Sequence, residues 1–301
     1  TAEDVAAEVP AYGRFVAQQV ARLGRSNPMI RTQFFSEEID SGGGMFPPQR
    51  QALMAGEHQK ITPPAVPPAI YCLLLDVAGE DEGANAARAG EAALPPESMR
   101  NPARDATALT VAQVDLSTLA DEVLKAPTYR VVYRQVWCGV RHPAIYAQVR
   151  SLADAFRARY VVVDATGVGA GLAAFLAKAL GEQRVIPFVF SQKSKSDLGW
   201  AFLAVVDSGR FQDYRENDLE RQLFRQQLDF CQYQVLDAPN KIMRWSVPDG
   251  TRDPASGELV HDDLLISAAL TAVLDAQVWH SAGAARVVAP KDPLEEMSKG
   301  F

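Results

Sequence analysis

The sequence predicts an α/β protein in which a mixed β-sheet is flanked by helices. Two apolar runs, IYCLLLDV from residue 70 and YVVVDATG from residue 160, read as buried strands. Two further runs, ATALTVAQVD and YRVVYRQVW, are rich in β-branched and aromatic residues, as strands are. Segments with apolar residues at helical spacing lie between the later strands. We therefore expect an antiparallel three-strand meander joined to parallel strands.

Size and composition are those of a soluble globular chain. The 301 residues are 48% hydrophobic and 22% charged, which is ordinary for a folded domain. No apolar run approaches the roughly 20 residues needed to span a bilayer, and residues 1–13 are no signal peptide. We therefore expect no membrane partner.

The charge and the cysteines narrow the possible functions. The net charge of −7, with a pI near 5.2, argues against a protein that coats nucleic acid over a broad surface. It is compatible with a local basic rim around an acidic centre. Cys72, Cys138 and Cys231 are widely spaced in apolar or aromatic runs and read as buried thiols of a cytoplasmic protein. The four histidines show no metal-ligand spacing.

The first 57 residues read as a leader that cannot close a core alone. Residues 11–23 form an amphipathic helix ended by Gly24, and IRTQFF is a short strand-like piece. A glycine turn follows, and then a helix that begins near Pro47. Residues 58–69 carry the proline cluster ITPPAVPPAI, which is typical of a stiff extended linker. We place the domain boundary there.

The predicted domain covers residues 70–281, and its first half contains the meander. Ile70–Asp76 is a buried strand, and Ala106–Asp115 and residues 129–137 are the next two strands. The insertion at residues 78–104 is too long for an ordinary hairpin loop.

The second half of the domain alternates helices and strands. A helix over residues 143–156 leads to the strand at 160–164, a glycine-rich turn and the helix LAAFLAKAL. The strand RVIPFVF and helices at residues 197–206 and Leu219–Phe230 come next. The run FCQYQVLDAPNKIMRWSV predicts a β-hairpin with its turn at 237–240. HDDLLISAAL then opens a last helix, and the tail at 282–301 has little pattern.

Aspartates mark the ends of the buried-looking elements. Asp76 and Asp164 end apolar strands, and the pair Asp262–Asp263 opens the last helix. An N-cap role explains Asp262 about as well as a functional one, because aspartate favours helix N-termini. Carboxylates that converge on one sheet edge repel unless cations occupy the site, and oxygen ligands suit magnesium or manganese. Two such ions can activate water and stabilise the leaving oxygen of a phosphodiester.

The order of these features resembles the RNase H-like, RuvC-type nuclease fold. LLLDV, the meander, VVVDATGVG, the hairpin and the late HDD are similar, more narrowly, to the nuclease domain of a tailed-phage terminase large subunit. The resemblance runs from about Tyr12 to Trp279. It implies an endonuclease that cuts concatemeric double-stranded viral DNA during genome packaging, with two Mg²⁺ or Mn²⁺ ions.

The resemblance also assigns roles to the acids by position. Asp76, Asp164 and Asp263 match the three metal ligands, and Asp262 is an auxiliary ligand or a cap. Asp105 matches a further acid near the metals in some relatives, although a strand-initiating turn explains it equally well. The insertion at 78–104 departs from the short loop of the family.

The leader extends the resemblance upstream. RTQFFSEEID followed by GGGMF is similar to the end of the terminase ATPase domain. No GxxxxGK[ST] motif occurs, so the packaging ATPase is missing from this chain, and DATGVGAG does not fit GxGxxG. An excised fragment is the favoured interpretation. The implied partners are that ATPase domain, the portal and the small terminase subunit, in the host cytoplasm and transiently at the procapsid portal, outside the mature virion.

Contact with DNA is expected from a basic rim. The candidates lie near a helix start or on the hairpin, and for each the alternative is an ordinary solvated side chain. They are Lys193, Lys195, Lys241, Arg244 and Trp245, with Arg100 and Arg104 as weaker candidates and His261 as a modulator of metal-bound water or a helix cap.

Two other functions remain open from the sequence. Another RNase H-like nuclease, such as a junction resolvase or a transposase-like enzyme, would share the acids. A non-catalytic docking module of a packaging motor would also be consistent with the net charge of −7, which would suit docking to a portal or small subunit. The late HDD and the ATPase-like leader favour the terminase nuclease over the other nucleases.

Overall fold

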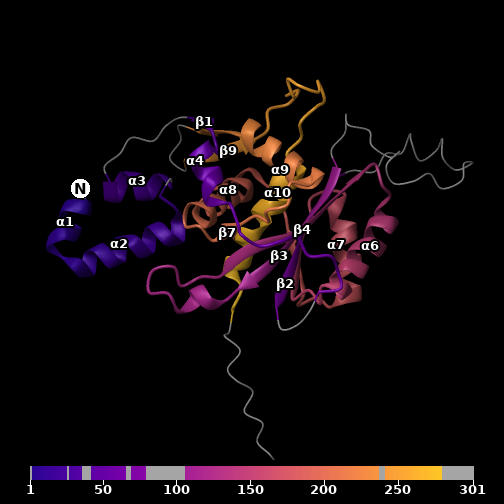
Figure 1. The fold of residues 1–301 in the computed structure, drawn as a ribbon, viewed down its shortest axis with the longest axis horizontal. Coiled ribbons are helices and arrows are strands. Elements are labelled where there is room, and N and C mark those ends of the chain that lie inside the picture. The colour runs from indigo at the N-terminus through magenta and orange to yellow at the C-terminus, as the bar shows by residue number, and fades with distance from the viewer. Residues whose placement is uncertain are drawn as a thin grey trace, which may run out of the picture.

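The computed structural model describes residues 2–25, 27–35, 42–65, 69–78, 106–236 and 241–279. A six-stranded sheet with the order β6-β5-β2-β3-β4-β7 forms its centre (Figure 1). Its strands are β2 (Ile70–Asp76), β3 (Ala106–Asp115), β4 (Thr128–Cys138), β5 (Tyr160–Asp164), β6 (Val185–Phe188) and β7 (Phe211–Gln212).

The pairing of these strands confirms the predicted mixed sheet. β2, β3 and β4 form an antiparallel meander, whereas β2 pairs with β5, and β5 with β6, in parallel. The short β7 pairs with β4 only at Tyr129 and Arg130. In the described part of the chain, the remainder of β4 therefore forms the outer edge of the sheet. This is the RNase H-like arrangement that the sequence predicted.

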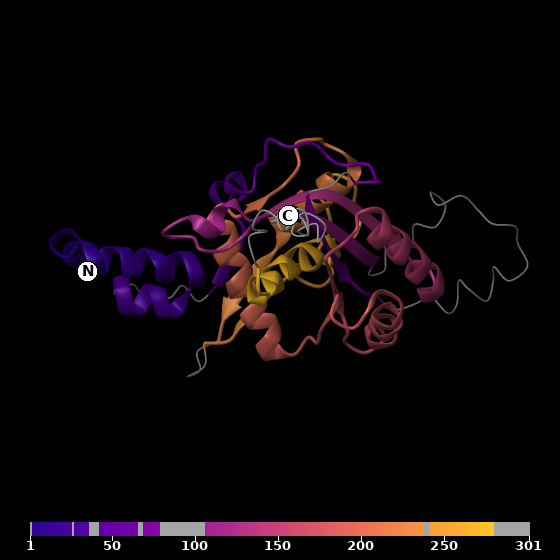
Figure 2. The ribbon, with the colours of Figure 1, turned by 90° about the horizontal axis from the view of Figure 1, so that it is seen from below.

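Helices cover both faces of the sheet, and β2 shows why. Its residues alternate between two cores, because successive side chains of a strand point to opposite faces. Leu73 and Leu75 pack with α6 (His142–Ala155) and α7 (Gly169–Leu180). Cys72 and Leu74 pack with the helices of the other face, which are α8 (Gln192–Asp207), α9 (Leu219–Phe230) and α10 (Asp263–Ala269). Figures 1 and 2 show the two helical layers.

A second sheet of three strands, in the order β1-β8-β9, lies beside the first. β8 (Gln232–Val235) and β9 (Met243–Ser246) form the predicted hairpin. β1 (Gly42–Gly44) pairs with the outer side of β8, so the expectation of a simple glycine turn there is wrong. Its partner lies about 190 residues away, which no local pattern can indicate.

The N-terminal helices correct one further expectation. The strand-like IRTQFF belongs to helix α3 (Pro28–Phe35), because a short apolar run fits either period. Helices α1 (Ala2–Glu8) and α2 (Pro10–Leu23) precede it, and the predicted amphipathic helix is confirmed in α2. Gly24 ends α2 in close contact with α8: a Cβ there would lie 2.9 Å from Ala204 Cα.

Residues that follow β1 are buried in the core between the six-stranded sheet and α8. Met45, Phe46 and Met54 are buried with the α8 side chains, on either side of α4 (Pro48–Leu53). The sheet pairing and this burial tie residues 42–54 to the domain that begins at Ile70. The assignment of residues 1–57 to an ATPase-domain leader stays a prediction.

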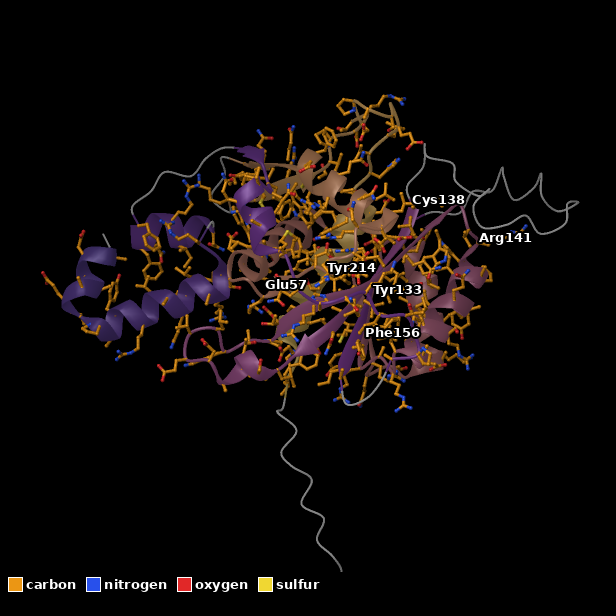
Figure 3. All side chains as sticks on the ribbon, in the orientation of Figure 1. Glu57, Tyr133, Cys138, Arg141, Phe156 and Tyr214 are labelled. Atoms are coloured by element: carbon orange, nitrogen blue, oxygen red, sulfur yellow. The ribbon has the colours of Figure 1, made fainter. Side chains whose placement is uncertain are left out.

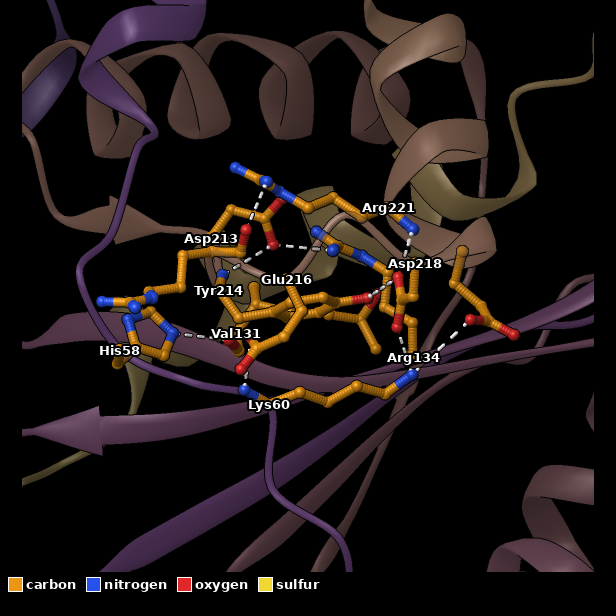
Figure 4. A network of polar contacts seen from close by, with 12 residues as sticks. His58, Lys60, Val131, Arg134, Asp213, Tyr214, Glu216, Asp218 and Arg221 are labelled. Atoms are coloured by element: carbon orange, nitrogen blue, oxygen red, sulfur yellow. Dashed lines mark hydrogen bonds and ion pairs between the residues drawn. The ribbon is translucent and has the colours of Figure 1, made fainter.

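Polar contacts hold the predicted linker against the domain (Figure 4). His58 Nε2 lies 2.6 Å from the carbonyl oxygen of Val131, and the Lys60 N–H donates to Glu216. The Lys60 ammonium bonds Asp218 and the Glu220 carboxylate. Residues 58–61 therefore follow the edge of β4 that β7 leaves open.

A buried ion pair stabilises the same region. The Arg134 guanidinium, 1% exposed, donates to Asp213 at 2.6 Å and lies 4.0 Å from the centre of the Phe224 ring (Figure 4). Arg221 approaches the second oxygen of Asp213 at 3.4 Å. This network joins β4 to α9 and gives the buried Arg134 and Asp213 partners of opposite charge.

The three cysteines lie in or beside the packed cores. Cys72 and Cys231 are buried and Cys138 is half-buried, and none of the three is in a disulfide. Within the described ranges, no helix has the length and apolar character needed to cross a bilayer.

Candidate acidic centre

Asp76 and Asp164 end neighbouring parallel strands. Leu75 of β2 is in register with Val163 of β5, so the next residue of each strand is an aspartate at the same sheet edge. In open α/β sheets this carboxyl edge is where ligands collect. The strand adjacency that a shared site requires is therefore present.

The turn after β5 orients Asp164. Its Oδ1 accepts a hydrogen bond from the Thr166 N–H at 2.8 Å, and the Asp164 side chain is 7% exposed. Gly167 has a left-handed φ of 52°, which glycine adopts without steric cost. Gly169 begins α7 against the strand end: a Cβ there would lie 2.2 Å from the Asp164 carbonyl oxygen. The glycines therefore let the helix begin close to the acid.

Helix α10 brings Asp263 to the same edge. Asp263 Oδ2 accepts a hydrogen bond from the Ala106 N–H at 3.0 Å, where β3 begins. One helical turn later, Ser267 Oγ lies 2.9 Å from the Leu74 carbonyl oxygen and 2.8 Å from Thr110 Oγ1. Residues four apart share one helix face, so α10 is attached to β2 and β3 along that face. Asp263 is 8% exposed as a result.

Asp262 lies at the N-cap position of α10 but makes no side-chain capping bond. Its Oδ2 is 3.8 Å from the ammonium of Lys195, which belongs to the first turn of α8. The side chains of the pair are 26% and 35% exposed. The position thus agrees with the cap interpretation, whereas the contact is an ion pair.

Asp76 is the carboxyl on which the charges of the other three acids and of Lys195 act. Burial raises the pKa of the Asp76 carboxyl well above its usual range, and repulsion by Asp263, Asp164 and Asp262 raises it further. Lys195 opposes this with a smaller attraction. Burial also raises the pKa of Asp164, against the hydrogen bonds from Thr166. The sequence-predicted ligands therefore interact with one another, and we call them, together with Asp262, the carboxylate cluster.

The raised pKa values predict how the metal-free protein responds to pH. The folded state holds protons on Asp76 and Asp164 at pH values where the unfolded chain, with an aspartate pKa near 3.9, has lost them. The stability contributed by these two groups must then fall as pH rises from about 3.9 through the raised pKa values. Thermal unfolding in EDTA across this window should show the decline, and Asp76→Asn should flatten it. An Asp76→Asn profile parallel to that of the parent would contradict the prediction.

The donors in the cluster fit a hard divalent cation, but they are not pre-arranged as a cage. All four side chains offer carboxylate oxygens, the ligands that Mg²⁺ and Mn²⁺ prefer. Among the residues that the structure describes, no three His, Cys, Asp or Glu side chains converge closely enough to hold an ion as they stand. A cation would have to draw the carboxylates together, which their mutual repulsion otherwise opposes.

The predicted DNA contacts occupy different environments. The Lys193 side chain is 77% exposed and pairs with Asp197, and Arg244 is exposed on β9. Lys241 is half-buried, with a φ of 42°. Trp245 is only 3% exposed, so it packs inside the protein and has almost no surface to offer DNA.

Several sequence-predicted residues lie outside the described ranges. Asp105, Arg100 and Arg104 are among them, together with most of the 78–104 insertion and the hairpin turn at 237–240. Their proposed roles stay predictions. His261 is half-buried and lies one residue before the N-cap position of α10, so by position it does not cap this helix.

A groove of about 760 Å³ adjoins the cluster. It is lined at one end by Ala106, His261 and Asp263, and it runs along the β4 edge past Trp137 to Lys60. Figure 3 shows Tyr133 midway along β4 and Cys138 near its end, which marks the direction of the groove. The strand edge that β7 leaves unpaired therefore forms one wall of a groove that reaches Asp263.

Sequence reasoning missed the contacts that assemble the cluster. Ser267 follows Asp263 by one helical turn, a spacing visible in the sequence, yet its bonds to β2 and β3 were not anticipated. The burial of Trp245 was also signalled, since Met243 and Trp245 alternate with the exposed Arg244 along β9.

Comparison with known proteins agrees with this architecture. Residues 95–222 match the family model described as the terminase RNase H-like domain. The nuclease domain of the large terminase of Thermus phage P74-26 aligns with a TM-score of 0.50 at 15% identity, covering 79% of this chain and 100% of that one. The magnesium-bound large terminase nuclease of the thermophilic phage G20c aligns with a TM-score of 0.49 at 17% identity, covering 76% and 96%. No curated protein matches the chain at a significant level. Residues 95–222 are thus similar to terminase RNase H-like domains.

Proposed function

We propose that this chain, as a terminase RNase H-like domain, is a metal-dependent endonuclease that cuts double-stranded viral DNA concatemers during genome packaging. The observation that carries the proposal is that Asp76 and Asp164 end adjacent parallel strands, and that Asp164 and Asp263 both act electrostatically on Asp76. Four carboxylates with one nearby lysine form a strongly negative centre, which suits divalent cations far better than it suits DNA alone. The family match to residues 95–222 supports the same conclusion.

The mechanism assigns each acid a task. Asp76, Asp164 and Asp263 would hold two Mg²⁺ or Mn²⁺ ions, with Asp262 as an auxiliary ligand. When bound, such ions activate water and neutralise the charge that develops on the leaving oxygen of a phosphodiester. The Thr166 N–H orients the Asp164 carboxylate, and the Ala106 N–H orients that of Asp263. These bonds hold two ligands on rigid elements, which lowers the cost of arranging the site.

DNA would approach along the basic rim. Lys193 and Arg244 are exposed on α8 and β9, where phosphates can reach them. Lys195 and Lys241 are less exposed contacts in this proposal. The cutting of packaged DNA further implies the ATPase domain of the full-length protein, the portal and the small terminase subunit as partners, at the procapsid in the host cytoplasm.

A plasmid-cleavage assay tests the proposal. We expect the parent chain to nick or linearise supercoiled DNA with Mg²⁺ or Mn²⁺ and to be inactive in EDTA. Asp164→Ala and Asp263→Ala should each reduce the rate by at least about 10²-fold, because each removes a metal ligand. Asp154→Ala is the control, since Asp154 is an exposed carboxylate on α6, on the opposite face from α10.

The outcome separates the alternatives. Cleavage that survives both substitutions would overturn the nuclease assignment. Metal binding without cleavage would favour the docking module. The net negative charge of the chain and the unpaired part of the β4 edge would then form contacts with a partner protein. Cleavage restricted to branched DNA would favour a junction resolvase.

A further inference from the structure

Among the residues that the structure describes, Lys195 is the cation that acts on Asp76, and contacts with the hairpin fix its position. Its ammonium lies 3.8 Å from Asp262 Oδ2, and its charge attracts the Asp76 carboxylate. The carboxylates that repel Asp76 are Asp263, Asp164 and Asp262, and Lys195 opposes their effect. The positive charge of Lys195 therefore acts on Asp76 and pairs with Asp262.

Trp245 contacts both the backbone and the ammonium of Lys195. The indole Nε1–H donates to the Lys195 carbonyl oxygen at 2.7 Å, and the ammonium lies 5.5 Å from the centre of the indole ring. This distance is within the range in which an ammonium is attracted to an aromatic face. Since Trp245 is 3% exposed, the ring is a fixed support.

Two further contacts join the hairpin to the same helix turn. Ser196 Oγ accepts a hydrogen bond from the Met243 N–H at 2.9 Å. Gly199 leaves no room for a side chain, since a Cβ would lie 2.4 Å from both Met243 Cε and Trp245 Nε1. The first turns of α8 and strand β9 therefore form one packed unit that ends in the Lys195 ammonium.

We propose that Lys195 is an internal counter-cation of the carboxylate cluster, positioned by Trp245, and that divalent cations bind in competition with it. The inference rests on the proposed metal-dependent function. In the metal-free protein the ammonium offsets part of the repulsion among the acids. When a cation enters, the ammonium repels it and loses its pairing with Asp262. The charge of Lys195 therefore weakens metal binding and stabilises the empty cluster.

Isothermal titration of the full chain with Mn²⁺ alone, without DNA, tests this competition. We expect Lys195→Met to bind Mn²⁺ about three- to tenfold more tightly than the parent, the range expected for a partly exposed charge. The matched control is Lys193→Met, because Lys193 lies in the same helix turn but pairs with the exposed Asp197. Its affinity should stay within about twofold of the parent.

Lys195→Arg separates charge from packing. It keeps the positive charge and should therefore bind Mn²⁺ nearly as the parent does, whereas a purely structural role of Lys195 would disturb both variants alike. Trp245→Phe removes the indole donor and should shift the affinity in the same direction as Lys195→Met, by less. In the double variant the two effects should fall short of their sum, because both act through one ammonium.

The results divide cleanly. Equal or weaker Mn²⁺ binding by Lys195→Met than by the parent, with the parent binding normally, overturns this inference and leaves the proposed function standing. No Mn²⁺ binding by the parent overturns both. Tighter binding by Lys193→Met as well would show a general charge effect and would also overturn the specific role of Lys195.

Discussion

Replacing Asp76 by asparagine is expected to abolish DNA cleavage while making the metal-free protein more stable. The two effects have one cause. Ionised Asp76 would be a buried charge repelled by Asp263, Asp164 and Asp262, so the charged form is unfavourable without cations. An amide of the same shape removes the charge and with it the repulsion. Under the proposed function it also removes an anionic oxygen ligand, so we expect metal binding and the chemistry that depends on it to be lost.

The expected sizes are large enough to measure. Cleavage of supercoiled plasmid in Mg²⁺ should fall at least about 10³-fold, which corresponds to about 4 kcal/mol of barrier. Urea unfolding in EDTA at pH 8 should show a higher free energy of unfolding for the variant than for the parent, since the raised pKa of Asp76 means that its charged form is unfavourable in the folded state. Asp154→Asn, on the exposed side of α6, should change neither quantity appreciably.

A variant that loses activity and also loses stability would point to a different role. Asp76 would then be a structural group whose carboxylate the fold requires, and the repulsion account would be wrong. Addition of saturating Mn²⁺ gives an independent check. It should stabilise the parent by mass action and have little effect on Asp76→Asn.

The strands that carry the acids could be predicted because their signal is local. Apolar runs that end in Asp76 and Asp164 indicate buried strands. The meander leaves β4 parallel to β2, and helix α6 between β4 and β5 returns the chain, so that β5 is parallel to β2 as well. The helix opened by Asp263 was equally readable from its apolar pattern. Each strand or helix that carries an acid of the cluster could therefore be predicted from a short segment of the sequence.

The supports of the cluster depend on contacts between distant segments. β1 pairs with β8, and Lys195 meets Trp245 and Asp262, across separations that no window of sequence contains. Lys195 was predicted to contact DNA because it lies near a helix start, where backbone phosphates can approach. Its place beside the carboxylates follows only from the packing of α8 against the hairpin.

Gly169→Ala is expected to damage both folding and cleavage, whereas Gly171→Ala, two residues later, should do neither. A methyl group at residue 169 would lie 2.2 Å from the Asp164 carbonyl oxygen and 3.3 Å from Val77 Cβ. The first contact is with backbone, which cannot rotate away, so α7 must shift from the end of β5. At Gly171 a methyl group meets nothing within 4 Å.

The shift bears directly on the acid that ends β5. Displacement of α7 strains the turn in which Thr166 orients Asp164, and a misplacement of about 1 Å in a catalytic group can cost about 10²-fold in rate. We expect a loss of about 2–4 kcal/mol in the free energy of unfolding and about 10²-fold in plasmid cleavage. Gly171→Ala should gain up to about 1 kcal/mol, because alanine favours a helix interior. Equal behaviour of the two variants would mean that the close approach of α7 to Asp164 does not govern the site, and the role given to the glycine-rich turn would have to be abandoned.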